Sequence, residues 1–286
     1  MRFVTVALLI IIGCVVYRVP VGAETSFDIA QAPASGKWQL LETGLEMGEF
    51  ISRQRSDSGD SVIRVLRIDP QYFELRLMNA SATEKGRALT AKQWCQQFGL
   101  VAAVNASMYQ QDYKTSVSLM RNRKHTNNAR LSKDMAILAF DRLRPGVPAV
   151  KIIDRECEDF SRWKDRYGTL VQSIRMLSCT GKNVWSPQSQ KWSTASIAVD
   201  RKGRVMFIHT RSPYSTHDLI NILRRLPLSI SRALYTEGGH QAQLYINGGG
   251  RQMEFVGQME SNLASAATVS IALPIPNVVG VVRKSE

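Results

Sequence analysis

The chain has 286 residues, of which 44% are hydrophobic and 21% are charged, and this composition excludes an intrinsically disordered protein. Its formal net charge of +13 favours an acidic partner such as a phosphate-bearing glycan, and a solvated basic surface accounts for the charge equally well. The sequence has no long basic block and no aromatic-basic repeat, so nucleic acid is not an expected partner.

The first 23 residues are typical of a signal peptide or an N-terminal anchor. Arg2 supplies a positive end, residues 4–17 are mainly apolar, and Val21-Gly22-Ala23 offers small residues for cleavage. The apolar run is shorter than the roughly 20 residues that span a membrane. Two alternatives are a lipidated Cys14, in the lipobox-like Ile11-Ile12-Gly13-Cys14, and an uncleaved anchor. All three predict an exported, periplasmic or extracellular protein that meets the membrane only through this segment.

Hydrophobic runs predict many strands after the leader. Residues 24–59 form an expected N-terminal extension, and residues 60–286 are expected to form one domain because no linker or internal repeat divides them. Runs 61–69 and 73–77 are predicted to pair with each other around Pro70. The other expected strands are 38–41, 100–104, 116–120, 135–140, 170–177, 194–200 paired with 204–210, 252–256, 268–273 and 278–282.

Two helices complete the pattern. Thr90 caps the first, at 91–98, and Ser215 caps the second, which extends to position 226. Trp94 is expected to pack the first helix on the core, and the charged segment 141–166 is expected to be irregular. Many strands with few helices predict an α+β fold, a single domain of mixed, largely antiparallel β-sheets with a few flanking helices.

Three cysteines follow the leader, and an odd number permits at most one disulfide and one free thiol. Cys157 and Cys179 flank one segment and are the expected pair, with Cys95 left over. No Cys-x-x-Cys or His-Glu-x-x-His motif occurs, so a structural zinc site is not expected. No cofactor is expected, and a divalent cation is left open. The Walker phosphate loop and the Gly-x-Ser-x-Gly elbow are absent, which excludes the commonest nucleotide hydrolases and serine esterases.

Residues 233–246 carry the main candidate site. We predict a strand, a tight turn at Gly238-Gly239 and a second strand. The glycines can adopt positive φ and let another group approach the backbone closely. Glu237 and His240 then project from the shoulders of the turn, where a carboxylate and an imidazole could transfer a proton or bind a metal. An ordinary hairpin with polar tips is the alternative.

Further candidates lie at the ends of other expected strands. Asn105 and Ser107 follow the buried run 100–104 and offer an amide and a hydroxyl. Arg211 follows the strand 204–210. A basic segment could neutralise phosphate or form a solvated surface, and its charged residues are Arg121, Arg123, Lys124, His125 and Arg130.

The order of three motifs resembles the phosphodiester glycosidase family over about residues 60–283. Asn105 matches the family's Asn-Gly-Gly or Asn-Ala-Gly motif, and Gln172-Ser173 matches its Gln-Ser-Gly-Pro motif. Glu237-Gly238-Gly239 matches its Asp-Gly-Gly motif. The three motifs occur in the family's order along the chain.

The chain also departs from the family's motifs. Glu237 stands in place of an aspartate that is one methylene shorter, Ile174-Arg175 replaces Gly-Pro, and Thr194 is the nearest match to a common family arginine. Arg175 or Arg211 could supply the missing positive charge. Because catalytic sites need sub-ångström placement, these changes could reduce catalysis severely.

The resemblance implies an exported hydrolase that cleaves a sugar-1-phosphodiester, at the glycosidic bond to phosphate, in an envelope or extracellular glycan. Glu237 would stabilise the cationic sugar or activate water, with His240 assisting. The expected substrate-binding residues are Asn105, Ser107, Gln172, Arg175, Arg211, Gly238 and Gly239. Of these, Asn105, Gln172 and Arg211 are expected to meet Glu237 in one cleft. The alternative is a catalytically impaired homologue that binds anionic glycans, and the sequence makes no prediction of oligomeric state.

Overall fold

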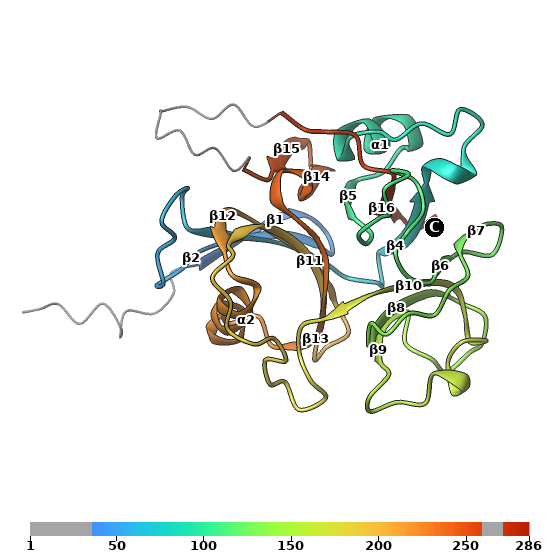
Figure 1. Ribbon diagram of the computed structural model, residues 1–286. Coiled ribbons are helices and arrows are strands. Elements are labelled where there is room, and N and C mark those ends of the chain that lie inside the picture. Colours follow the sequence, from blue (N-terminus) through green and yellow to red (C-terminus); the bar gives the residue numbers. More distant parts are fainter. Residues whose placement is uncertain (1–35, 259–270, 286) are drawn as a thin grey trace, which may run out of the picture. The chain divides into compact units, whose positions relative to one another are not determined.

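The computed structural model describes residues 36–258 and 271–285, which form two antiparallel β-sheets with helices packed on them (Figure 1). The expected leader at 1–23 lies outside the described residues, as does the first half of the expected strand at 268–273, whose second half is not a strand. Within the described ranges, no helix is both long and apolar enough to cross a membrane.

The large sheet has eleven strands, nine of which follow one another in a continuous order. The other two extend it from β10, because β8 pairs with β10 and β9 pairs with β8. In spatial order the nine are β1 (Gly36–Glu42), β2 (Leu45–Ile51), β3 (Val62–Ile68), β12 (Val205–Tyr214), β11 (Trp192–Asp200), β13 (Ile230–Gly238), β10 (Tyr167–Arg175), β6 (Met120–Arg121) and β7 (Thr126–Asn128), and the two others are β8 (Ala136–Arg142) and β9 (Val150–Asp154).

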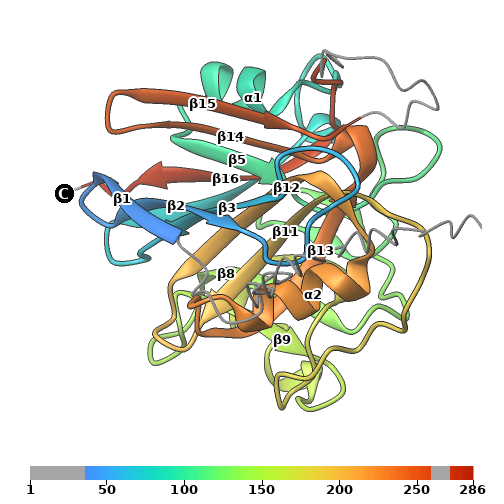
Figure 2. The same cartoon turned by 90° about the vertical axis from the view of Figure 1, so that its left-hand side faces the viewer.

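The small sheet has five strands, and Figure 2 shows them above the strands of the large sheet. One hydrophobic cluster fills the space between the sheets, with Leu66, Phe207 and Leu234 from the large sheet and Val104 and Val279 from the small one. Each of these five side chains is fully buried, which stabilises the fold by about 1.5–3 kcal/mol per side chain. In spatial order the strands are β15 (Arg251–Val256), β14 (Gln243–Gly248), β5 (Ala102–Asn105), β16 (Asn277–Arg283) and β4 (Phe73–Asn79).

The first helix packs on the small sheet as the sequence predicts. α1 (Ala91–Phe98) begins with a capping box between Thr90 and Gln93 and ends at Gly99, which has a left-handed φ of 63°. Such a cap is worth about 1 kcal/mol. Trp94 is fully buried in the cluster that α1 shares with the small sheet, so its expected packing role is confirmed.

The second helix packs on the large sheet. α2 (Thr216–Arg225) is capped by Ser215, whose side chain accepts a hydrogen bond from the Asp218 N–H. Its buried face places Leu219 and Leu223 in a cluster with residues of β3, β11 and β12. Two sheets with a helix on each confirm the expected α+β fold of largely antiparallel sheets.

The predicted pairing of runs 61–69 and 73–77 is wrong. β3 pairs with β2 and β12 in the large sheet, whereas β4 pairs with β16 in the small one. A turn at residues 69–72 carries the chain between the sheets, so that Leu66 of β3 and Leu75 of β4 enter the same core from opposite sides. The expected irregular segment 141–166 also contains β9, which pairs with β8.

Candidate functional site

Residues 233–246 form a crossing between the two sheets instead of the expected hairpin. β13 pairs with β10 and β11 in the large sheet, and β14 pairs with β5 and β15 in the small sheet. The chain passes between them through one 3-10 turn, η3 (Gly239–Gln241). The hairpin prediction is wrong because each strand pairs with other strands, and two glycines permit a crossing as readily as a tight turn.

The two glycines have different functions in the crossing. Gly239 has a φ of +66°, the left-handed conformation that favours glycine. Gly238 is extended, but a Cβ on it would collide with the Tyr235 hydroxyl and lie 2.8 Å from Cδ1 of Trp192. The prediction that glycine lets another group approach the backbone closely is therefore confirmed at Gly238.

Glu237 lies at the end of β13, directly before the crossing. A β-bulge precedes it, since Tyr235 faces Ser196 and Glu237 faces Ala195 on β11, and bulges re-aim side chains. The side chain is 8% exposed, and within the described residues its carboxylate accepts one hydrogen bond, from the Gly238 N–H at 3.0 Å. Burial raises the pKa of the Glu237 carboxyl to about 7, against the opposing effect of that hydrogen bond. A carboxyl group in this range can donate or accept a proton near neutral pH.

Three aromatic residues that the sequence analysis did not select lie near this end of β13, with Tyr109 and Tyr235 close to the Glu237 charge and Trp192 close to Gly238. Burial, followed by the charge of Glu237, raises the pKa of Tyr109 and of Tyr235. The Tyr109 hydroxyl is buried without a hydrogen-bond partner among the described residues. Such a group costs about 1–3 kcal/mol, so a ligand that bonds to it gains affinity. The sequence could have identified both tyrosines as candidates. Tyr235 precedes Glu237 by two residues on one expected strand, and Tyr109 ends the segment that begins at Asn105.

Asn105 and His209 hold the crossing from opposite sheets. The Asn105 amide accepts a hydrogen bond from the Gln243 N–H at 2.7 Å and donates one to the Gln241 carbonyl at 2.9 Å. His209 Nε2 lies 3.2 Å from the Ala242 carbonyl, and burial lowers the pKa of this histidine to about 4, so it is neutral at pH 7. The Asn105 amide therefore fixes the backbone of the crossing four and six residues after Glu237.

Ser107 and Gln172 also come together, through the Gln172 backbone. The Ser107 hydroxyl donates to the Gln172 carbonyl at 3.1 Å. The Gln172 side chain is fully buried, accepts from the Leu119 and Ser132 N–H groups, and donates to the Ser132 and Asp134 carbonyls. These four bonds use its full capacity. Substrate binding by Gln172 stays a prediction that requires some of these bonds to be exchanged.

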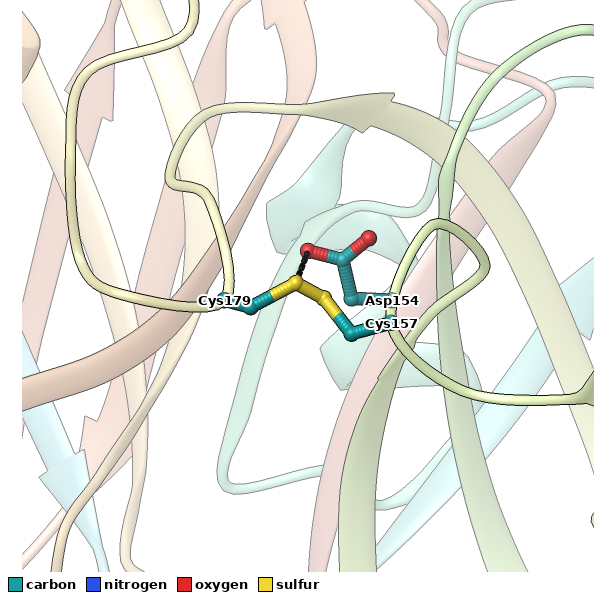
Figure 3. Close-up of side chains that lie close together, drawn as sticks. All are labelled: Asp154, Cys157 and Cys179. Carbon is teal, nitrogen blue, oxygen red and sulfur yellow. Dashed lines mark hydrogen bonds between the residues drawn. A yellow bond between two sulfur atoms is a disulfide. The ribbon is translucent and has the colours of Figure 1, made fainter.

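Arg175 lies in a charged cluster beside a disulfide. Its guanidinium donates to both carboxylate oxygens of Asp154, at 2.9 and 3.1 Å, and also to Glu156. Cys157 and Cys179 form the expected disulfide next to Asp154 (Figure 3). Asp154 and the two cysteines are the one group of potential metal ligands that gathers within the described ranges, but bonded sulfur atoms cannot act as thiolate ligands. The predicted role of Arg175 toward substrate would require it to leave these carboxylates.

Arg211 and His240 are the two remaining candidates, one on β12 and one in the crossing itself. Arg211 is half-buried on β12, and its carbonyl accepts a hydrogen bond from the Ser193 hydroxyl on β11. Ser193 precedes Thr194, which faces Gly238 across the sheet. His240 is half-buried in η3, and its ring forms no hydrogen bond with the described residues. Their roles in binding and catalysis, and the shared cleft, stay predictions.

Comparisons with known proteins agree with the expected resemblance. The chain has no match among curated proteins. The zebrafish N-acetylglucosamine-1-phosphodiester alpha-N-acetylglucosaminidase catalytic domain, auto-inhibited by its pro-peptide, is similar in structure with a TM-score of 0.60 at 10% identity, over 87% of this chain and 88% of that one. A hypothetical protein from Synechocystis gives a TM-score of 0.57 at 14% identity, over 88% of this chain and 64% of that one. These likenesses show a shared fold. The phosphodiester glycosidase family model matches residues 98–282, so the chain belongs to the phosphodiester glycosidase family.

Proposed function

We propose that this protein is an exported hydrolase that cleaves the glycosidic bond between a sugar and a phosphodiester in an envelope or extracellular glycan, with Glu237 as its catalytic carboxyl group. The observation that carries the proposal is the environment of Glu237. Its buried carboxyl group has a pKa raised to about 7 and lies beside the Tyr109 hydroxyl, which has no hydrogen-bond partner among the described residues. The chain belongs to the phosphodiester glycosidase family. The name of the zebrafish relative, a phosphodiester glucosaminidase, supports the substrate class.

The chemistry requires one water molecule and one base. The bond between the anomeric carbon and the phosphate oxygen breaks, and the phosphate leaves with the electron pair as a stable anion that needs little protonation. Deprotonated Glu237 accepts a proton from water as its oxygen bonds to the oxocarbenium-like carbon. The products are a free sugar and a phosphate monoester. The Tyr109 hydroxyl would donate a hydrogen bond to the sugar or the phosphate.

Export has independent support from the disulfide. Cys157 and Cys179 are bonded to each other, and disulfides persist mainly in oxidising compartments outside the cytosol. The N-terminal residue of the mature protein tests this part directly, since a cytosolic protein that begins at Met1 contradicts export. A lipid on Cys14 would change only the site of cleavage.

One observation favours a non-catalytic glycan-binding protein as the second candidate. Thr194, the nearest match to the family arginine, is buried opposite Gly238, and its hydroxyl contacts only the Trp192 carbonyl among the described residues, at 3.5 Å. Arg175, which could replace that charge, is bound to Asp154. Arg211 would then be the remaining candidate cation for the phosphate.

The deciding experiment uses purified residues 24–286 with a panel of sugar-1-phosphodiesters. Release of both free sugar and phosphate monoester, lost in Glu237→Gln, supports the hydrolase. Binding of a panel member by calorimetry, with no turnover on any of them, supports the glycan-binding alternative.

A further inference from the structure

The exposed edge of the small sheet borders a large groove, called here the β4 groove. β4 is the last strand of its sheet, and the cavity beside it has a volume of about 1530 Å³. One wall consists of β4, the following residues 81–89 and the end of α1, and the other consists of residues 122–125 and parts of β8, β9 and β10. Pockets for small molecules have volumes of about 300–1,000 Å³, so this groove suits a longer ligand.

The groove is strongly basic. Seven lysine and arginine residues line it, against the three carboxylates of Glu74, Glu84 and Asp141. The cations are Arg76, Lys85, Arg87, Arg123, Lys124, Arg142 and Lys284. Arg123 is paired with Asp141 through two hydrogen bonds of 2.7 Å. A concave surface lined by one sign of charge concentrates its field on a ligand of the opposite sign.

Four of these cations are exposed and form no ion pair within the described residues, namely Arg76, Lys85, Arg87 and Lys124. They come from three separate parts of the chain and line one cavity. Their charges are therefore available to a ligand, and binding an anion requires no internal salt bridge to break.

Hydrogen bonds join the two walls of the groove. The Ser81 hydroxyl, in η1 (Ala80–Ala82), lies 2.8 Å from Nε2 of His125, and it accepts a hydrogen bond from the Asn127 amide at 2.8 Å. His125 and Asn127 belong to the β6–β7 segment on the opposite wall. The walls are thus held together before a ligand arrives, which lowers the entropic cost of binding.

The lining favours a charged glycan over the other common polyanions. Phe73 and Phe140 are buried in the core and Phe98 stacks on Trp94, so the groove offers no series of open rings for nucleic-acid bases. None of the large exposed apolar side chains of the described residues lines it, whereas membrane-surface binding uses such side chains.

We propose that the β4 groove binds an acidic polysaccharide, whose phosphate or sulfate groups contact Arg76, Lys85, Arg87 and Lys124. The site is separate from the candidate catalytic site, because Asn105, Glu237 and the residues around them do not line the groove. The proposal is independent of whether Glu237 hydrolyses any substrate.

The test measures binding of dextran sulfate and of uncharged dextran of the same length at several salt concentrations. We expect dextran sulfate alone to bind, with an affinity that falls as salt rises. The triple variant Arg76→Gln/Lys85→Gln/Arg87→Gln should raise the dissociation constant at least about tenfold, because charge-assisted contacts are lost. All three side chains are exposed, and thermal melting checks that the variant folds.

A matched control removes three exposed cations elsewhere, as Arg201→Gln/Lys202→Gln/Arg224→Gln. The proposal holds if this control binds dextran sulfate like the unmutated protein, and it is overturned if both triple variants lose affinity equally, since net charge alone would then explain binding. Tighter binding of oligo(dT) or of phosphatidylglycerol vesicles than of dextran sulfate, lost in the groove variant, also overturns it. Glu237→Gln should leave dextran sulfate binding unchanged, which separates this result from any failure to find turnover.

Discussion

Glu237 is 8% exposed and accepts one hydrogen bond, whereas Arg76, Lys85 and Arg87 of the β4 groove are exposed and unpaired within the described residues. The buried carboxyl group has lost water, so its protonation shifts into the range where proton transfer is useful. The exposed cations act through their combined field. The two regions therefore suit different tasks, bond cleavage in one and retention of a polyanion in the other.

The substitution with the largest expected effect, Glu237→Gln, should change hydrolysis without changing polyanion binding. Glu237→Gln keeps the size of the side chain but removes its charge, so kcat on a sugar-1-phosphodiester should fall at least about a hundredfold while substrate affinity changes little. Dextran sulfate binding should not change. Glu237→Asp restores the usual family residue and tests the longer reach, since higher activity would mark the extra methylene as a fault. Unchanged turnover in Glu237→Gln would remove this residue from the mechanism.

A second substitution tests the packing of the crossing. In Gly238→Ala the new Cβ collides with Tyr235 and approaches Trp192, so we expect the free energy of unfolding to fall by about 1–3 kcal/mol. The matched control is Gly239→Ala, which has open space around its Cβ and only the cost of a positive φ, about 1 kcal/mol. Urea denaturation measures both. A larger loss in Gly239→Ala than in Gly238→Ala would contradict the close approach at Gly238.

The pH dependence of stability is a third test. The pKa of Glu237 is raised from an ordinary value of 4.5 to about 7, so the folded protein holds this proton more tightly than the unfolded chain. Its contribution is therefore fully present below pH 4.5 and is lost as pH rises to about 7, at up to roughly 1.4 kcal/mol per pH unit. Denaturation at several pH values from 4 to 8 gives the free energy of unfolding as a function of pH. Its slope should differ between the unmutated protein and Glu237→Gln by this amount. Parallel profiles for the two proteins would contradict the raised pKa of Glu237.

The smallest expected effect concerns Tyr109. Its hydroxyl is buried without a partner among the described residues, so Tyr109→Phe breaks no hydrogen bond there and should not lower the free energy of unfolding. If the hydroxyl binds substrate, kcat/KM should fall about tenfold. Tyr113→Phe is the control, because the Tyr113 ring lies 5.8 Å from that of Tyr109 but is 65% exposed. Equal activities in the two variants would assign Tyr109 to packing alone.

Local signals in the sequence located the helices and the hairpin of 194–200 with 204–210, which is β11 paired with β12. They did not reveal the strand partners of 61–69, of 73–77 or of the two strands in 233–246. Thr90 and Gly99 bound α1 as expected, because capping depends on residues next to the helix. Pairing depends on distant partners, so nothing near 69–72 or 238–239 reveals that the chain changes sheets there. The alternating pattern of a strand is the same in either sheet.

The motifs in the sequence selected candidate site residues but could not show which contacts the fold gives each of them. The motifs identified Asn105 and Glu237, and the structure joins their segments through the Gln241 and Gln243 backbone. The sequence could not show that the Gln172 amide is used by the fold, because this depends on its contact with residues 119–134. The basic run at 121–125 was visible as charge, but only the folded chain places it opposite β4.

The crossing at η3 also determines when the site forms during folding. The hydrogen bond between Asn105 and Gln243 joins residues 138 positions apart, and the bond between Ser173 and Tyr235 spans 62. Contacts of such long range form slowly, since a long loop must close before they stabilise anything. We therefore expect the surroundings of Glu237 to assemble only after both sheets have docked. A newly made or partly unfolded chain would therefore lack the arrangement around Glu237 that the proposed hydrolysis requires.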